Sequence, residues 1–224
     1  MELTTTHRKK PYKGLAMEGV IAAWYAKNTA GNLPLFRHLA GRIAASLQPG
    51  ARILEVAPGP GYLAIELARL GSYHVTGVDI SRSFVRIAAE SAARAGVRAD
   101  FQQGDAAAMP FPAGSFDFIV CCAAFKNFRG PLGALREMHR VLRSGGTALI
   151  IDMRKDAPDD VISKEVSKMN LGAFSRFVTK IILRQLRNRA YTKETFQELL
   201  MQTPFQNGDI SEEGMGLEVT LLKS

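Results

Sequence analysis

The sequence has few cysteines, a single tryptophan and no long apolar run. Its 224 residues include two cysteines, Cys121 and Cys122, which are adjacent and lack both a disulfide framework and metal-ligand spacing. We interpret them as small buried side chains, which suits a reducing compartment. No stretch approaches the roughly 18 apolar residues of a membrane-spanning helix, and the basic N-terminus lacks the apolar segment of a signal peptide. The chain is therefore expected to be cytoplasmic.

The remaining composition is that of an ordinary folded domain. Hydrophobic residues make up 46% and charged residues 22% of the chain, which argues against disordered, collagen-like and coiled-coil proteins. The length suits one α/β domain with additions, or at most two small domains. The formal net charge of +8 favours an anionic partner, namely nucleic acid, a membrane surface or an acidic substrate, but does not choose among them.

From residue 51 onward, short apolar runs alternate with helical patterns. Strands are predicted at 52–56, 73–78, 97–103, 116–122 and 147–151, and helices at 62–70, 83–95 and 132–142, the last ended by Ser144-Gly145-Gly146. This alternation predicts a parallel sheet with helices on both faces. Two more strands, 209–211 and 217–222, are joined by a turn so short that they must pair antiparallel. The predicted fold is therefore a Rossmann-like mixed α/β sheet.

Four segments are expected along the chain. Residues 1–48 form an N-terminal helical cap with helices at 14–27 and 33–47, and residues 49–152 form the ligand-binding core. Residues 153–190 are a helical insertion or lid, and residues 191–224 supply a C-terminal helix and the antiparallel strand pair. The cap and the insertion are placed to cover the carboxyl ends of the strands, where open α/β sheets bind ligands.

The strongest local signal is LEVAPGPGYLAIELA, residues 54–68. Gly59 and Gly61 have no Cβ, so a ligand can approach the backbone, and the following helix begins with free N–H groups. The letters match the G-x-G-x-x-A fingerprint of dinucleotide sites, which is weak evidence alone. Asp79 ends the second strand 20 residues after Gly59, where a carboxylate can accept both ribose hydroxyls. Its alternative role is a helix N-cap, which Ser81 or Ser83 could equally supply.

The chain resembles the class I S-adenosylmethionine (SAM)-dependent methyltransferases, most closely the subgroup that includes the ubiquinone/menaquinone-biosynthesis C-methyltransferases. The matching pieces are LEVAPGPGY, VTGVDIS, GDAAAMPFPAGSFDFIVCCAAF and LREMHRVLRSGGTALIID, which cover residues 51–152, together with the C-terminal hairpin. The resemblance implies a strand order of 3-2-1-4-5-7-6 with strand seven antiparallel. It also implies SAM as the cofactor and S-adenosyl-L-homocysteine as the product, with no metal.

The resemblance further implies where the cofactor lies. Glu55 and the two glycines would line its methionine end, Asp79 would hold the ribose, and Asp105 would accept the amino group of adenine. Backbone near Cys122 would lie close to the sulfonium. The expected cofactor-binding residues are Glu55, Ala57, Gly59, Gly61, Asp79, Ile80, Gly104, Asp105, Ala106, Cys122 and Ala123.

Candidates for contact with the methyl acceptor are Tyr25 in the cap and Phe125 and Asn127 after the fourth strand, with Lys126 and Arg154 as further candidates. Each has the alternative of core packing or a solvated loop. Methyl transfer from a sulfonium works largely by positioning, and a base is needed only when the acceptor holds its proton tightly. The sequence shows no Ser-His-Asp set for such a role.

Residues 174–187 form a basic amphipathic helix, with apolar side chains at helical spacing and four cations on another face. It is interpreted as a lid over the site, with contact to an anionic membrane, dimerisation or RNA contact as alternatives.

The predicted function is SAM-dependent methyl transfer to a small or lipid-like molecule by a monomer or homodimer. The alternatives are an RNA or protein methyltransferase that uses the basic surface, and a non-catalytic SAM-binding protein. The loop after the fourth strand lacks the Asp/Asn-Pro-Pro-Tyr/Phe pattern of amino-methylating DNA enzymes, which argues against nucleic acid as a partner. An NAD dehydrogenase would leave Asp105 and the antiparallel last strand unexplained.

Overall fold

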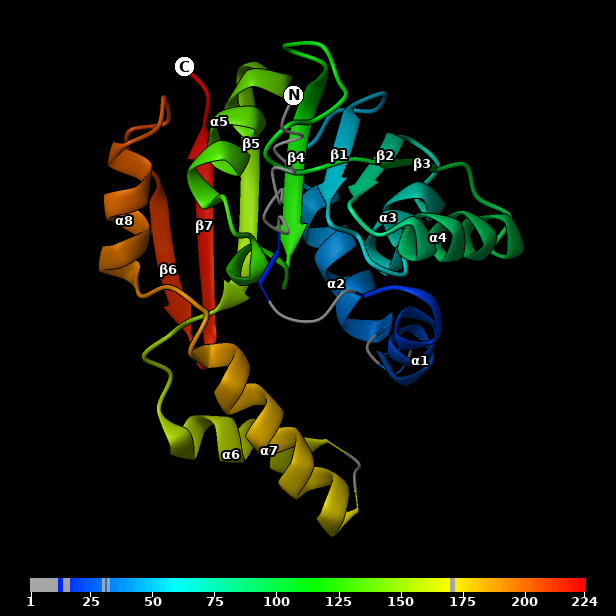
Figure 1. The fold of residues 1–224 in the computed structure, drawn as a ribbon. Helices are drawn as coiled ribbons and strands as arrows, with labels where there is room; N and C mark the ends of the chain where they lie inside the picture. The colour runs from blue at the N-terminus through cyan, green and yellow to red at the C-terminus, as the bar shows by residue number, and fades with distance from the viewer. Residues whose placement is uncertain (1–11, 14–16, 30, 32, 170–171) are drawn as a thin grey trace, which may run out of the picture.

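The fold is built around one seven-stranded sheet with the order β3-β2-β1-β4-β5-β7-β6 (Figure 1). The computed structural model describes residues 12–13, 17–29, 31, 33–169 and 172–224. The strands are β1 Arg52–Val56, β2 His74–Asp79, β3 Asp100–Gln103, β4 Phe116–Cys122, β5 Leu142–Met153, β6 Asp209–Glu213 and β7 Gly216–Leu222. Strands β1 to β5 pair in parallel, whereas β7 runs antiparallel to both neighbours. The predicted fold class and strand order are confirmed.

Helices cover both faces of the sheet. They are α1 Gly19–Thr29, α2 Leu33–Ala44, α3 Tyr62–Arg69, α4 Arg82–Arg94, α5 Pro131–Val141, α6 Asp159–Lys168, α7 Ala173–Arg187 and α8 Lys193–Met201, with a short 3-10 turn at Phe125–Asn127. Successive side chains of a strand point to opposite faces. On β4, Ile119 and Cys121 therefore pack with α5 and α8, whereas Phe118 and Val120 pack with α2 and α3.

Two strands begin three or more residues away from the predicted start. The third strand was expected from residue 97 but begins at Asp100, because the N–H of Val97 bonds back to the carbonyl of Ala92 and completes the end of α4. The fifth strand was expected only from 147 but begins at Leu142. Gly145 and Gly146 were predicted to stop the preceding helix, yet both bond to the backbone of Lys223 near the C-terminus.

The segments outside the alternating core also differ in detail. The first cap helix was predicted from residue 14 but begins at Gly19, while residues 1–11 and 14–16 of the predicted cap lie outside the described residues. Within 153–190, the predicted basic helix is α7, and α6 precedes it without having been predicted. Figure 1 shows this α6–α7 pair projecting beyond the end of the sheet where the parallel strands finish. None of the helices in the described residues has both the length and the apolarity to cross a membrane.

Candidate active site

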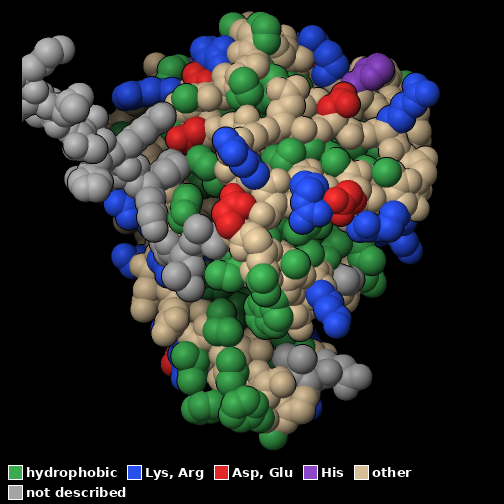
Figure 2. All heavy atoms as spheres, turned by 45° about the vertical axis from the view of Figure 1, so that its right-hand side comes forward, with side chains coloured by type: hydrophobic (Ala, Val, Ile, Leu, Met, Phe, Trp, Pro, Cys, Tyr) green, Lys and Arg blue, Asp and Glu red, His purple; other side chains and the backbone are tan. Residues whose placement is uncertain are grey.

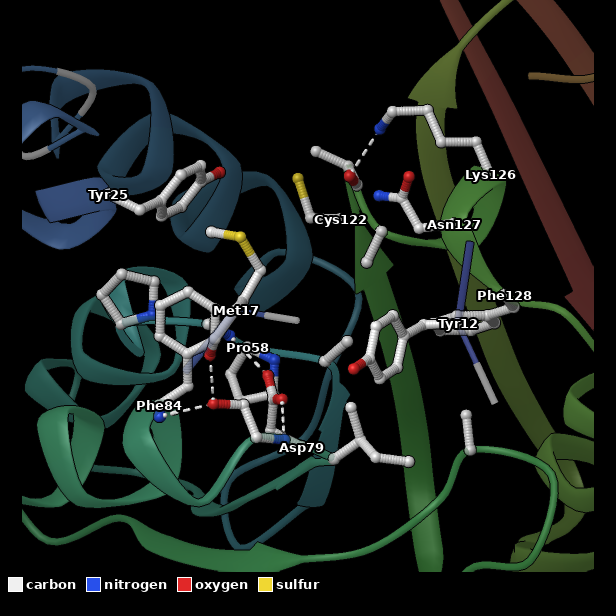
Figure 3. A pocket seen from close by; sticks show the side chains of 18 of the residues that line it. Tyr12, Met17, Tyr25, Pro58, Asp79, Phe84, Cys122, Lys126, Asn127 and Phe128 are labelled. Carbon is white, nitrogen blue, oxygen red and sulfur yellow. Dashed lines mark hydrogen bonds between the residues drawn. The ribbon is translucent and has the colours of Figure 1, made fainter. Parts of the chain in front are cut away.

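A cavity of about 890 Å³ opens at the carboxyl ends of β1, β2 and β4 (Figure 3). This volume lies at the upper end of the range for small-molecule sites. Side chains of α1, such as Trp24, and of α7, such as Ile182, complete its walls. The expected cap and insertion thus both reach the end of the sheet where open α/β folds bind ligands.

The predicted cofactor-binding residues converge on this cavity from the ends of four strands, β1 to β4. The residues that line it are Glu55, Ala57, Gly59, Asp79, Ile80, Gly104, Asp105, Ala106, Cys122 and Ala123. These residues are far apart in the sequence but lie close together, because parallel strands place their carboxyl ends at one edge of the sheet.

The turn between β1 and α3 leads the chain sharply around the cavity. Gly59 has a φ of +56°, and a Cβ added to it would meet nothing within 4 Å, so a ligand can lie against its backbone. Gly61 has a φ of +82°, and an added Cβ would lie 2.9 Å from the Cβ of Ala88 on α4. Gly61 does not line the cavity. Its predicted ligand contact is therefore corrected, since it serves the close packing of α3 on α4.

Glu55 is buried at the end of β1, and one carboxylate oxygen accepts the N–H of Ala64 at 2.8 Å. One of the N–H groups predicted to be free for a ligand at the start of α3 is thus already satisfied. Burial raises the pKa of Glu55 to about 8, the bond from Ala64 opposes this rise, and the charge of Asp79 adds to it. A ligand cation beside Glu55 would favour its ionised form.

The carboxylate of Asp79 bonds to the loop after β1 and to the loop after β2. Its Oδ2 accepts the N–H of Gly59 at 3.0 Å and its Oδ1 accepts the N–H of Ser81 at 2.9 Å. Each carboxylate oxygen keeps further acceptor capacity for a ligand hydroxyl. Burial raises the pKa of Asp79, although the two backbone bonds act against the rise. The N-cap of α4 is Ser81, so Asp79 is not needed for the alternative role considered from the sequence.

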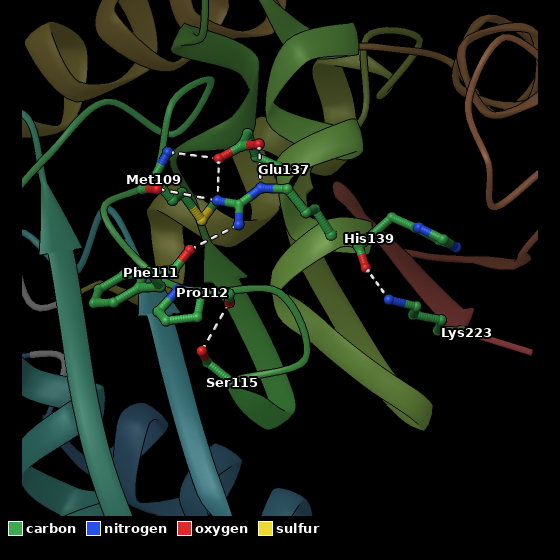
Figure 4. Close-up of polar contacts among 8 residues, drawn as sticks. Met109, Phe111, Pro112, Ser115, Glu137, His139 and Lys223 are labelled. Carbon is green, nitrogen blue, oxygen red and sulfur yellow. Dashed lines mark hydrogen bonds and ion pairs between the residues drawn. The ribbon is translucent and has the colours of Figure 1, made fainter.

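Asp105 follows β3 in a loop that α5 holds in place. Its Oδ1 accepts the N–H of Ala107 at 2.9 Å. Further along the loop, Glu137 accepts the N–H of Met109 at 2.7 Å, and Arg140 donates to the carbonyls of Met109 and Phe111 at 3.1 and 2.7 Å (Figure 4). The loop that carries Asp105 is therefore fixed by a paired Glu137–Arg140 unit on one helix.

The end of β4 contains a buried ion pair. Lys126 is buried, with 5% of its surface exposed. Its Nζ donates to Asp152 Oδ1 at 2.7 Å and to the carbonyl of Ala123 at 2.6 Å. Asp152 Oδ2 accepts the backbone N–H of Lys126 at 2.8 Å. Ala123 has a φ of +58°, a conformation that costs about 1–2 kcal/mol for a residue with a Cβ. The ion pair thus holds this strained turn at the wall of the cavity.

Two polar side chains face the same part of the cavity (Figure 3). Tyr25 packs edge-on against Phe84, and burial raises the pKa of its hydroxyl, which remains a neutral donor and acceptor. Asn127 has a buried Oδ1 without a hydrogen-bond partner among the described residues. Because buried polar atoms are nearly always satisfied, this oxygen fits a ligand that brings an N–H or O–H group.

Two predicted acceptor residues do not reach the cavity. Phe125 is fully buried and packs against Phe128, Tyr191 and Phe196, so its predicted contact with the acceptor is corrected to a core role. The aromatic cluster draws it to the inner side of the 3-10 turn, while its neighbours line the cavity. Arg154 pairs with Asp156 and with Glu212 of the C-terminal hairpin and is likewise absent from the lining.

The N-terminal segment supplies residues that the sequence did not reveal. The N–H of Lys13 donates to the carbonyl of Asn127 at 2.7 Å, and Tyr12 forms an isolated antiparallel bridge with Phe128. Glu18 accepts the N–H groups of Arg82 and Ser83 at 3.0 and 3.1 Å, and lies close enough to Asp79 to raise its pKa. No motif marks these residues, because their contacts join segments far apart in the sequence.

A family model and solved structures show what this chain is similar to. Residues 53–146 match the model described as "Methyltransferase domain". The fold is that of the SAM-dependent methyltransferases. A structure of one from Aquifex aeolicus has a TM-score of 0.68 at 20% identity and covers 88% of this chain and 96% of its own. The plantazolicin methyltransferase BpumL, solved with S-adenosylhomocysteine, has a TM-score of 0.68 at 16% identity and covers 91% of this chain and 89% of its own.

Curated relatives match the same core. Demethylmenaquinone methyltransferase of Thermus thermophilus is 37% identical over 102 residues, which are 45% of this chain and 46% of that protein. A ubiquinone/menaquinone biosynthesis C-methyltransferase, UbiE, of Geotalea uraniireducens is 35% identical over 107 residues, 46% of each. The chain thus spans about half the length of the curated relatives it matches. The resemblance predicted from the sequence is confirmed: residues 53–146 match a methyltransferase domain, and the whole fold is similar to that of SAM-dependent methyltransferases.

Proposed function

We propose that this protein transfers the methyl group of SAM to a small, lipid-like molecule. The observation that carries the proposal is a single cavity that joins two kinds of lining. One end has the open backbone of Gly59 and the carboxylates of Asp79 and Asp105, and the other has Tyr25 and the unpartnered oxygen of Asn127. The first end suits an adenosyl ligand. The second suits an acceptor with a polar group.

The charges at the two ends suit the two reactants. The acceptor attacks the sulfonium methyl carbon of SAM in line, the bond between that carbon and the sulfur breaks, and S-adenosylhomocysteine leaves. The carboxylates of Glu55, Asp79 and Asp105 lie along the proposed cofactor end, whereas Lys13 and Arg189 line the cavity on the side of Asn127. The N–H of Lys13 donates to the carbonyl of Asn127, and Arg189 donates to the carbonyl of Lys13. A cationic surrounding stabilises an acceptor oxyanion or enolate and lowers the pKa of its parent hydroxyl. Such an acceptor can react without a dedicated base.

The acceptor is proposed to have an apolar body with a polar, acidic head. Apolar side chains such as Met17, Trp24 and Phe36 line the cavity around Tyr25. The relatives named demethylmenaquinone methyltransferase and ubiquinone/menaquinone biosynthesis C-methyltransferase support a lipid-like quinone precursor as the first acceptor to try. The polar head would present its donor to Asn127.

The first experiment is calorimetric titration with SAM, S-adenosylhomocysteine and NAD. We expect both adenosyl compounds to bind and NAD not to bind. Asp79→Asn, which keeps one carbonyl acceptor, is expected to weaken SAM binding at least about tenfold, because each hydrogen bond to a charged group contributes about 1.5–3 kcal/mol. Binding of NAD, or of none of the three, would contradict the proposed cofactor.

Turnover tests the acceptor. Release of S-adenosylhomocysteine is measured with lipid-like hydroquinones and with polar phenols as acceptors. Asn127→Ala is expected to lower kcat/KM for the acceptor while leaving the affinity for SAM unchanged, and Phe125→Leu, which alters only the core behind the turn, serves as the matched control. Tight SAM binding without turnover on any acceptor would favour a non-catalytic SAM-binding protein.

A further inference from the structure

Helix α7 presents a row of large apolar side chains to solvent. Phe174 is 79% and Phe177 63% exposed, and Val178, Ile181 and Ile182 are exposed as well. No residue of the helix is buried. Figure 2 shows hydrophobic side chains gathered over the lower end of the molecule, where α7 lies in Figure 1. Contiguous apolar surface of this kind marks an interaction site.

The apolar row is not used for packing the α6–α7 pair. Leu183 of α7 packs with Ile162 and Val166 of α6. At 100° per residue, Phe174, Val178 and Ile181 share a face that is turned away from Leu183 by more than a quarter turn. The α6–α7 pair therefore has a small core of its own and leaves a second apolar face without a described partner.

The positive charge of α7 indicates which kind of partner binds this exposed apolar face. Its sequence, AFSRFVTKIILRQLR, has four basic residues and no acidic one. Arg184 and Arg187 pair with Asp159 of α6, whereas Arg176 and Lys180 form no ion pair among the described residues. A second copy of this chain would bring a helix of the same charge against α7, in a protein of net charge +8. An anionic surface meets this helix without that repulsion.

The exposed face of α7 adjoins the mouth of the cavity. Ile182 and Leu186 line the cavity from α7, and Ile21 and Trp24 line it from α1. Trp24 is 61% and Ile21 44% exposed, so each side chain belongs both to the opening and to the outer surface. Tryptophan is favoured where apolar and aqueous phases meet. Two segments far apart in the sequence thus form apolar rims around one opening.

We propose that α7, together with the exposed apolar end of α1, docks on an anionic lipid bilayer with the cavity mouth facing the membrane. The apolar side chains enter the boundary of headgroups and acyl chains, as in other interfacial helices. Lys180 lies next to Phe177 at the edge of the apolar face, where its long side chain reaches the lipid phosphates, and Arg176 adds to the positive charge of the docked helix. Docking needs neither SAM nor turnover, so it goes beyond the proposed function. If that function also holds, a lipid-like acceptor enters the cavity from the bilayer.

The experiment is co-sedimentation of the full chain with vesicles of phosphatidylcholine alone or mixed equally with phosphatidylglycerol. We expect binding to the anionic vesicles, weaker binding to the neutral ones, and release at high salt. Phe174→Ser/Phe177→Ser is expected to weaken binding at least about tenfold because it removes two large apolar side chains from the interface. Arg176→Gln/Lys180→Gln is expected to weaken binding to the anionic vesicles by roughly tenfold.

The matched control is Met201→Ser/Leu222→Ser, which removes two similarly exposed apolar side chains on α8 and β7 and is expected to bind vesicles like the original protein. Unchanged circular dichroism and SAM titration verify that each variant is folded. The proposal is overturned if neither vesicle binds, or if the phenylalanine variant binds as well as the control. It is also overturned if sedimentation velocity shows a stable dimer that the phenylalanine variant alone dissociates. SAM titration without vesicles separates these results from failure of the proposed function.

Discussion

Glu55 is a carboxyl group placed in the core at the edge of a ligand cavity. Its burial raises its pKa to about 8 from a usual value of 4.5. Between about pH 4.5 and pH 8, Glu55 therefore keeps its proton in the folded chain and has lost it in the unfolded chain. The stability of the ligand-free protein accordingly falls as pH rises from about 4.5 to about 8, and this contribution changes no further above that pH.

The same group predicts a pH dependence of SAM binding. SAM carries positive charge, so its complex favours the ionised form of Glu55. Below the pKa of Glu55 the carboxyl must lose its proton when SAM binds, and this cost lowers the affinity for SAM by up to about tenfold per pH unit. Affinity for SAM is expected to rise from about pH 6 to about pH 8 and then level off. Calorimetry across this range measures the effect. Glu55→Gln, which keeps an acceptor for the N–H of Ala64, is expected to lose the dependence. A flat profile in the original protein would contradict this role.

At the scale of elements, the turn between β1 and α3 must leave space for a ligand on one side and for helix α4 on the other. Gly59 leaves space on the side of the cavity, and Gly61 leaves space on the side of α4. Both have positive φ, so an alanine at either position is strained by about 1–2 kcal/mol. Only Gly61 adds a steric clash, with the Cβ of Ala88 at 2.9 Å and with Cζ of Phe101 at 3.1 Å.

Substitutions of the two glycines are therefore expected to differ in effect: the change at Gly59 mainly weakens SAM binding, and the change at Gly61 mainly lowers stability. Gly59→Ala is expected to lower the free energy of unfolding by about 1–2 kcal/mol and to weaken SAM binding at least tenfold, because its methyl group points into open space at the cavity. Gly61→Ala is expected to be the more destabilising of the two. Denaturant unfolding and SAM titration of both variants provide the measurement. Equal effects of the two substitutions on both quantities would rule out the division of roles.

Helix α5 is a second element whose role is positional. Through Glu137 and Arg140 it holds the loop between β3 and β4, and Lys223 donates to the carbonyls of His139 and Leu142 where the helix ends (Figure 4). A cation at this end also complements the helix dipole. The helix therefore ties the C-terminus to the loop that carries Asp105.

At the scale of the whole molecule, SAM would bind at the loops after β1, β2, β3 and β4, which meet only in the folded state. Ligand binding of this kind stabilises by about 2.7 kcal/mol at 100 times Kd. For a domain of this size, the midpoint of thermal unfolding is expected to rise by roughly 5–10 °C. Differential scanning calorimetry measures the rise. Asp79→Asn should show a much smaller rise, and Phe174→Ser/Phe177→Ser an unchanged one. Equal stabilisation by NAD would count against a SAM site.

The sequence by itself determined the sheet and much of the cofactor end of the cavity. The fold depends on local patterns, namely apolar strands, helical periodicity and a short C-terminal turn, and these are written in consecutive residues. Gly59, Asp79 and Asp105 could be predicted to lie at the cavity because each is at the end of a strand or within three residues of it. Parallel strands then bring such positions together at one edge of the sheet.

Only the tertiary structure decided the division between ligand contact and core packing. Phe125 and Asn127 lie in the same short turn, yet one side chain packs into the aromatic core and the other lines the cavity. Gly61 has the same local pattern as Gly59, but its neighbour is a helix that the sequence places 27 residues away. Glu18 and Lys13 reach the site through backbone contacts to segments more than 60 residues distant. Such contacts follow from the packing of whole elements, which local periodicity does not encode.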